Sequence, residues 1–154
     1  MTTKLPSAEV VVDIGSLHLS DSGAVFGQIW LRTNAAVSGA FPEIGWTDFP
    51  VVVLSWWLRE TDALMQGSST TAECAFIDGP FHFSVNRAGD VDLHEMQAGG
   101  VVTIGQCRSP TSRDELWRSV HLAACVVLEA CDTSRWSTVD IETLRAACRS
   151  RGSA

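Results

Sequence analysis

The chain has no tyrosine, although it contains six tryptophans and six phenylalanines among its 154 residues. It also lacks an apolar run of the ~20 residues that a membrane-spanning helix needs. The longest apolar stretches, residues 49–58 and 122–128, are too short. Residues 1–12 show neither the apolar segment nor the cleavage site of a secretion signal. We therefore expect a cytoplasmic protein that does not associate with membranes.

Motifs of common catalytic and phosphate-binding sites are missing too. The sequence has no Gly-x-Ser-x-Gly elbow, no P-loop and no Cys-x-x-Cys pair. Cys74, His82 and His94, joined by Asp78 or Glu95, match no standard zinc spacing. A Cys74–His82–Asp78 catalytic set is the kind that five cysteines and four histidines produce by chance. The sequence predicts no enzymatic activity, no metal and no cofactor.

The cysteine count is odd, which argues against a complete disulfide framework. We expect the five cysteines to be small buried side chains in a reducing compartment, with a disulfide or a zinc site as the alternative.

What the chain does contain is enough apolar material for one core. Hydrophobic residues make up 45% and charged residues 19% of the sequence, which is typical of a folded domain and not of a disordered tail. The length suits a single domain. We place that domain at residues 8–149 and expect frayed termini at residues 1–7 and 150–154.

Alternating apolar residues predict six strands. The first one slips in register at Gly15-Ser16, which indicates a bulge. Asn86 to Asp90 forms a turn in which Gly89 is free to take a positive φ. The predicted strands are residues 9–19, 24–33, 72–78, 81–86, 90–96 and 101–107, with a loop at residues 34–46.

Apolar residues at helical spacing predict two longer helices and a short last one. The first starts with Asp48 as its cap and Pro50 in its first turn, and Gly67 ends it. The second, residues 112–131, opens on a capping box from Ser112 to Glu115. The last begins within residues 137–140. The order β-β-α-β-β-β-β-α-α predicts an α+β fold, with a mostly antiparallel sheet of about six strands and two or three helices packed on it.

Negative charge is concentrated in the middle of the chain. Residues 43–95 contain nine acidic residues and two basic ones, Arg59 and Arg87, a net charge of −7 that equals that of the whole chain. Such a surface repels nucleic acid and attracts a basic protein. A solvated, solubilising surface is the alternative interpretation.

A short segment resembles a known family. Trp57-Leu58, Leu64 before Gly67 and the run Phe76-Ile77-Asp78-Gly79-Pro80-Phe81 are similar to some immunity proteins of polymorphic toxin systems. The similarity covers about 40 of the 154 residues. The resemblance implies inhibition of a cognate toxin domain by tight binding, and it carries no catalytic residues to transfer.

The sequence therefore predicts a non-enzymatic, acidic, protein-binding domain with a basic protein partner, and the resemblance implies an immunity protein. Alternatives are a small-ligand-binding protein or enzyme that uses a helix–sheet crevice lined by Trp57, Phe81 and Phe83, or a subunit of a larger assembly with an apolar patch near Trp30 or Trp56. The residues predicted to contact the partner are Glu60, Asp62, Asp78, Asp90, Asp92 and Glu95, with His82 and Trp56 as possible anchors.

Overall fold

The computed structural model describes residues 7–152 and confirms the α+β class. It contains two antiparallel four-stranded sheets and three helices. In chain order the elements are β1 (Ala8–Leu19), β2 (Val25–Thr33), β3 (Ala40–Phe41), β4 (Thr47–Asp48), α1 (Pro50–Gln66), β5 (Thr71–Ala75), β6 (Phe81–Asn86), β7 (Asp90–Gln97), β8 (Gly100–Arg108), α2 (Ser112–Thr133) and α3 (Val139–Gly152).

The first sheet is built around β2. The long strand β1 pairs antiparallel with β2, and the register shifts between Asp13 and His18, which confirms the bulge expected at Gly15-Ser16. The short strands β3 and β4 both pair with the other edge of β2. These two strands lie where the sequence predicted a loop and the start of a helix. They have only two residues each, too few for an alternating pattern to be visible.

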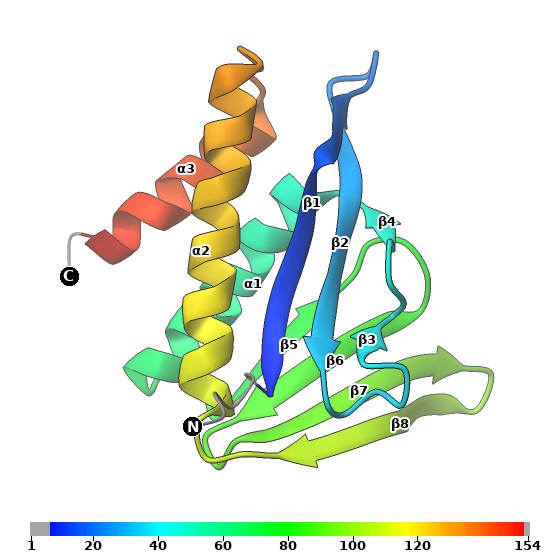
Figure 1. The fold of residues 1–154 in the computed structure, drawn as a ribbon. Coiled ribbons are helices and arrows are strands. Elements are labelled where there is room, and N and C mark those ends of the chain that lie inside the picture. Colours follow the sequence, from blue (N-terminus) through cyan, green and yellow to red (C-terminus); the bar gives the residue numbers. More distant parts are fainter. Residues whose placement is uncertain (1–6, 153–154) are drawn as a thin grey trace, which may run out of the picture.

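The second sheet has the strand order β5-β6-β7-β8. The single sheet of about six strands was therefore wrong in this respect. Both edges of β2 are occupied, one by β1 and the other by β3 and β4. The four later strands pair only with one another and form a separate sheet. In Figure 1 this sheet lies below the first one, and the helices stand to one side of both.

Helix α1 ends as predicted but starts one residue later. Gly67 takes a left-handed conformation with φ 82°, and its N–H reaches the carbonyl groups of Ala63 and Leu64. The residue at the N-cap is Phe49, without a side-chain hydrogen bond, so the Asp48 cap was wrong. Asp48 is instead drawn into a buried network with another loop, described below.

The capping box predicted for α2 is also wrong. Its N-cap is Thr111, and no side chain caps the helix backbone. The Glu115 carboxylate accepts the backbone N–H of Ser7 (3.0 Å) and the Thr111 hydroxyl. Ser112 pairs with the Ser7 hydroxyl. Ser7, more than a hundred residues away in the sequence, thus binds the side chains of Ser112 and Glu115, which the expected capping box would have used.

The same contacts extend the domain beyond residues 8–149. Ser7 is buried and bonded to α2, so it is not frayed, and α3 continues to Gly152. The remaining residues expected to fray, 1–6 and 153–154, lie outside the described residues. No helix within the described range is long and apolar enough to cross a membrane.

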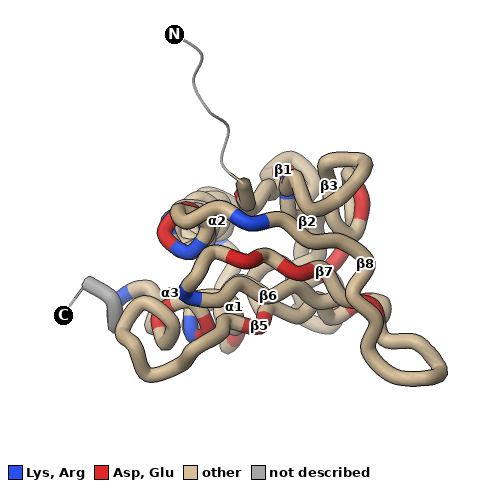
Figure 2. Tube along the Cα trace, turned by 90° about the horizontal axis from the view of Figure 1, so that it is seen from below, with Lys and Arg blue, Asp and Glu red and all other residues tan. Residues whose placement is uncertain are grey.

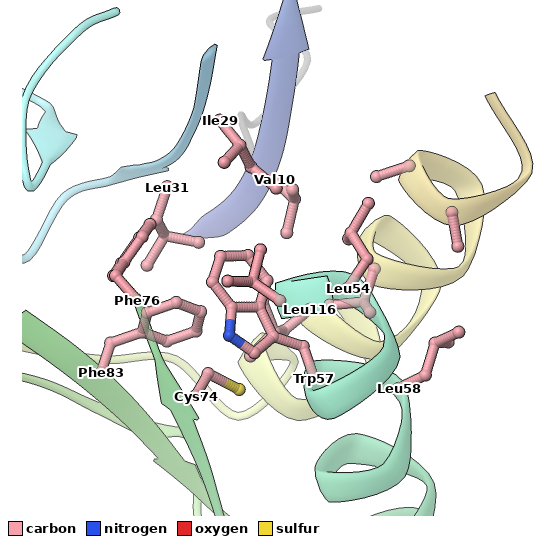
Figure 3. Packing of buried hydrophobic residues seen from close by; sticks show 14 of the residues in the cluster. Val10, Ile29, Leu31, Leu54, Trp57, Leu58, Cys74, Phe76, Phe83 and Leu116 are labelled. Atoms are coloured by element: carbon pink, nitrogen blue, oxygen red, sulfur yellow. The ribbon is translucent and has the colours of Figure 1, made fainter. Parts of the chain in front are cut away.

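The core is centred on aromatic side chains between α1 and the second sheet (Figure 3). Trp57 packs edge-on against Phe76 and Phe83, with ring centroids 5.1 Å away in both cases. Its indole N–H donates to the Ala75 carbonyl at 2.8 Å. Trp57 and Phe83 are fully buried, so the crevice expected beside Trp57, Phe81 and Phe83 is filled with packed rings.

Candidate functional site

The second sheet has one face in the core and one face in solvent. Val91 and Leu93 of β7 are buried, so the side chains between them, which alternate to the other side, face outward. Figure 1 shows the helices and the first sheet on the core side only. We call the outward side the open face; it is formed by Glu73, Ala75, His82, Ser84, Asn86, Asp90, Asp92, His94, Thr103, Gln106 and Arg108.

Strand register arranges the polar residues of the open face in rows. In one row Glu73 opposes Ser84, which opposes Asp92, and Gln106 donates to the Asp92 carboxylate at 2.7 Å. In the next row Asp90 accepts from the Asn86 amide at 2.9 Å and pairs with Arg108 at 3.5 Å. Figure 2 looks onto this face and shows acidic positions on β7 and near β5.

Helix α1 adds a carboxylate and a tryptophan beside the edge of this face. The Glu60 carboxylate accepts the backbone N–H of Glu73 at 2.9 Å and so lies against β5. Trp56 precedes Glu60 by one helical turn and shares its side of α1. Its side chain is 39% exposed, whereas Trp57 is fully buried. One of the two neighbouring tryptophans is thus in the core and the other is available on the surface.

Two histidines stack at the centre of the open face. His82 and His94 oppose each other across β6 and β7, with ring centroids 4.6 Å apart. The His94 ring nitrogens contact the Ser84 hydroxyl at 3.2 Å and the Thr103 hydroxyl at 3.3 Å. Partial burial, and then the neighbouring His94, lower the pKa of His82, while Glu73 opposes this shift. These surroundings therefore favour the neutral form of the His82 imidazole.

This stacking predicts a pH-dependent contribution to stability. The pKa of His82 is lowered from its ordinary 6.5 in the folded state, so below 6.5 the unfolded chain binds more protons than the folded one. The stabilising contribution is complete above this pH and is lost progressively as the pH falls towards the folded-state pKa. We expect the thermal midpoint of the wild type to fall more than that of His82→Gln between pH 7.5 and 5.5. Equal falls in the two proteins would contradict the shift.

Three predicted contact residues lie elsewhere. Asp62 accepts the indole N–H of Trp117 at 2.8 Å and so faces α2. Asp78 lies in the β5–β6 connection. Glu95 opposes Phe81 and Val102, and by strand alternation it points to the side opposite Asp92. The structure therefore brings together Trp56, Glu60, His82, Asp90 and Asp92, and separates them from Asp62, Asp78 and Glu95.

Cys74 does not join the histidines. It opposes Phe83 on the buried side of β5, whereas His82 lies on the open face. Burial, followed by the nearby Glu60 and Glu73 carboxylates, raises the pKa of the Cys74 thiol well above its usual value. Neither the zinc set nor the Cys74–His82–Asp78 set is assembled. Across residues 7–152, no three His, Cys, Asp or Glu side chains are grouped to hold a metal ion, and none of the five cysteines forms a disulfide.

The excess charge of residues 43–95 is divided among several places. Asp48 is buried in the loop network and Asp62 is turned towards α2. Four carboxylates remain together at the open face and its β5 edge, and we call them the acidic group: Glu60, Glu73, Asp90 and Asp92. In the last helix, Arg145 bonds Asp132 at 2.8 Å and Glu142 at 3.5 Å, both outside that stretch. Arg145 therefore does not neutralise the acidic group.

Surface hollows occur away from the acidic group. A cavity of about 500 Å³ lies between β1 and α2, and a second of about 400 Å³ continues it; both are bordered by Val126. Leu122 and Val126 of α2 are exposed there. These hollows between a helix and a sheet thus lie at β1 and α2, whereas the space beside Trp57 is filled by packed rings.

Sequence reasoning omitted Glu73 and His94 from the predicted contacts. The signal for both was present in the hairpin pattern, since pairing residues 72–75 with residues 82–85 places Glu73 on the same side as His82 and Ser84. The Glu60–Glu73 contact joins a helix to a strand thirteen residues further on, and no spacing rule predicts it.

No family model, curated protein or solved structure matches this chain.

Proposed function

We propose that this chain is a non-enzymatic protein-binding domain that binds a basic protein through the acidic group. The observation that supports the proposal is the gathering of Glu60, Glu73, Asp90 and Asp92 at one uncovered sheet face, beside the exposed Trp56. Among residues 7–152, Arg108 is the one base that forms an ion pair with any of these carboxylates, at 3.5 Å from Asp90, and its side chain is itself exposed.

Electrostatics gives this arrangement a physical use. Carboxylates gathered on one face raise the encounter rate with a cationic surface by roughly 10–1,000-fold, and salt screens the effect. An exposed tryptophan at the margin supplies the apolar contact that charged groups do not provide, since aromatic anchors dominate binding energy at many interfaces. The stacked rings of His82 and His94 add a flat aromatic surface to the same face.

The family resemblance makes the proposal more specific. In that reading the partner is a toxin domain with a basic active site, the carboxylates occupy the position of phosphate groups, and the complex forms in the cytoplasm. A gene for a large secreted toxin directly upstream, encoding a domain that binds this chain, would support the reading. If the captured partner is not a toxin, the general binding proposal stands and the family reading fails.

Reversing two charges of the acidic group tests the proposal. Proteins captured from the source organism by the wild type are compared with those captured by Asp90→Lys/Asp92→Lys. For a partner that only the wild type retains, we expect the association rate to fall roughly tenfold or more at low salt, and the difference to shrink at high salt. Surface plasmon resonance at several salt concentrations measures both effects.

A matched control separates local from global charge. Asp21 and Glu43 are exposed acids outside the acidic group, and Asp21→Lys/Glu43→Lys changes the net charge by the same amount. This control should keep most of the wild-type association rate. Equal losses in the two double variants would show that net charge alone matters, and an unchanged rate in Asp90→Lys/Asp92→Lys would remove the acidic group from the interface. Thermal unfolding checks that both variants are folded.

A further inference from the structure

The outer edge of β8 differs from the β5 edge of the same sheet and from the β1 edge of the first sheet. β8 is the last strand of its sheet and pairs only with β7. Its first half belongs to the β7–β8 hairpin, which reaches out from the body of the molecule in Figure 1. Its second half lies against the β2–β3 connection, because a Cβ added at Gly105 would stand 2.3 Å from the Ala35 carbonyl oxygen. The part of β8 that lies beyond this contact is residues 100–104, which we call the outer edge segment.

The register identifies which backbone groups point outward. The Met96 N–H bonds to the Pro80 carbonyl, on the β6 side of β7. Neighbouring residues of a strand alternate, so the backbone groups of Glu95 and Gln97 point to β8 and pair with Val102 and Gly100. Val101 and Thr103 of β8 consequently direct their N–H and C=O groups away from β7. Among residues 7–152, no hydrogen bond to these four backbone groups is formed.

At the opposite edge of this sheet, formed by β5, side chains hydrogen-bond the outward backbone groups one after another. The Ser69 hydroxyl bonds the Thr71 carbonyl at 2.7 Å, and Glu60 accepts the Glu73 N–H at 2.9 Å. The Trp57 indole donates to the Ala75 carbonyl at 2.8 Å.

At the β1 edge of the first sheet, the Ser119 hydroxyl of α2 accepts the Val10 N–H at 2.6 Å. Side chains thus protect two strand edges from pairing with another chain, while the edge of β8 has no such protection.

The outer edge segment is apolar and carries no charge. Val101 is 53% exposed and Ile104 is 45% exposed, with Val102 and Met96 exposed beside them. No charged residue lies between Glu95 and Arg108. Two copies of a chain with net charge −7 repel each other unless they meet at a neutral surface. The charge-free edge is such a surface, and β-branched residues pair well across strands.

We propose that two copies of this chain pair edge to edge through β8. The arrangement is a two-fold symmetric, antiparallel extension of the sheet, in which each copy uses the same residues. Hydrogen-bonded pairs require outward groups on both strands, so Val101 of one copy stands opposite Thr103 of the other, and Val102 meets its own counterpart at the two-fold axis. The two four-stranded sheets become one sheet of eight strands, and the acidic group stays uncovered.

The pairing is short, so the dimer is weak. Each copy contributes about five residues to the pairing. The buried surface area is therefore near 1,000 Å² or below, at the low end for specific interfaces. We expect a dissociation constant of roughly 10–100 µM. The association is expected to vary little with salt, because no charged side chain belongs to the pairing segment.

The test removes one outward N–H. Thr103→Pro deletes a donor that β7 does not use, and proline is tolerated at such edge positions. Sedimentation velocity of the full chain from roughly 1 to 500 µM should show a monomer–dimer equilibrium for the wild type and a monomer throughout for Thr103→Pro. Thr103→Ala is the matched control: it also loses the hydroxyl contact to His94 but keeps the N–H, and should dimerise like the wild type.

A second variant guards against a folding defect in Thr103→Pro. Val101→Lys places two like charges near the two-fold axis and should weaken dimerisation at least tenfold at low salt, while an exposed position leaves folding intact. A wild type that stays monomeric at every concentration overturns the proposal. A dimer that persists in both Thr103→Pro and Val101→Lys overturns it as well, because another surface then forms the contact.

Discussion

Replacing Asp48 by alanine is expected to lower the free energy of unfolding by about 3–5 kcal/mol, because several N–H donors lose a buried acceptor and each such loss costs about 1–3 kcal/mol. The side chain is 1% exposed. Its two oxygens accept four N–H groups: the backbone of Phe49 (2.8 Å) and Ile77 (3.2 Å) on Oδ1, and the Trp46 indole (3.0 Å) and the backbone of Asp78 (3.0 Å) on Oδ2. Alanine leaves all four donors without this acceptor.

The size of the effect reflects what Asp48 connects. Its carboxylate joins β4, the start of α1 and the β5–β6 connection, so it links the two sheets through a single side chain. A loss of 3–5 kcal/mol is a large part of the roughly 5–15 kcal/mol by which a domain is stable.

Urea unfolding followed by tryptophan fluorescence measures the loss, and Asp78→Ala is the control. Asp78 is exposed and contributes its backbone N–H to the network, so removing its side chain should change stability by less than about 0.5 kcal/mol. Similar midpoints for Asp48→Ala and Asp78→Ala would show that the buried carboxylate does not stabilise the fold.

Replacing Gly89 by alanine is expected to have a comparable or larger effect. Gly89 takes φ 89°, a conformation that side chains disfavour by about 1–2 kcal/mol. A Cβ there would also stand 1.8 Å from the Ser109 carbonyl oxygen and 2.6 Å from its carbon. These are backbone atoms, so the β6–β7 turn or the segment before α2 must move. The Ser109 N–H bond to the Gly89 carbonyl, now 3.1 Å, would be broken by that shift.

Gly99→Ala is the matched control for Gly89→Ala. Gly99 also lies in a turn between two strands, but nothing stands within 4 Å of an added Cβ and its φ is not in the left-handed region. We expect Gly89→Ala to lose at least about 3 kcal/mol of unfolding free energy, and Gly99→Ala to change by about 0.5 kcal/mol or less. Urea midpoints within 0.5 M or so of each other for the two variants would contradict the steric argument.

Asp48 also shows why the net charge of a sequence segment does not give the charge that this segment presents on the protein surface. It is one of the nine acids between residues 43 and 95, yet it is buried and satisfied by N–H donors. The sequence identified the acidic segment correctly, but the fold distributes those carboxylates among a buried network, a helix–helix contact, the hairpin and the open face. The binding proposal therefore depends on four carboxylates, not nine.

The amino-acid sequence determined the local structure of this protein. Alternation located the four strands of the second sheet and placed His82, Ser84, Asp92 and His94 on one side, because strand side chains alternate whatever the partner strand is. Pro50 and Gly67 bounded α1, and the positive φ at Gly89 was expected from the turn. Such features depend on neighbours a few residues away.

Only the tertiary structure decided which of these pieces meet. The pairing of the strands into two sheets could not be read from the sequence. Nor could two contacts between distant segments: Glu60 binds Glu73, thirteen residues away, and Glu115 binds Ser7, more than a hundred residues away. The same holds for β8: its charge-free sequence was visible, but its outer edge is open because β8 is the last strand of the four-stranded sheet that residues 7–152 form. A hydrogen-bond donor or a strand edge pairs with whichever group the folded chain places beside it. The spacing of residues along the sequence does not show which group that is.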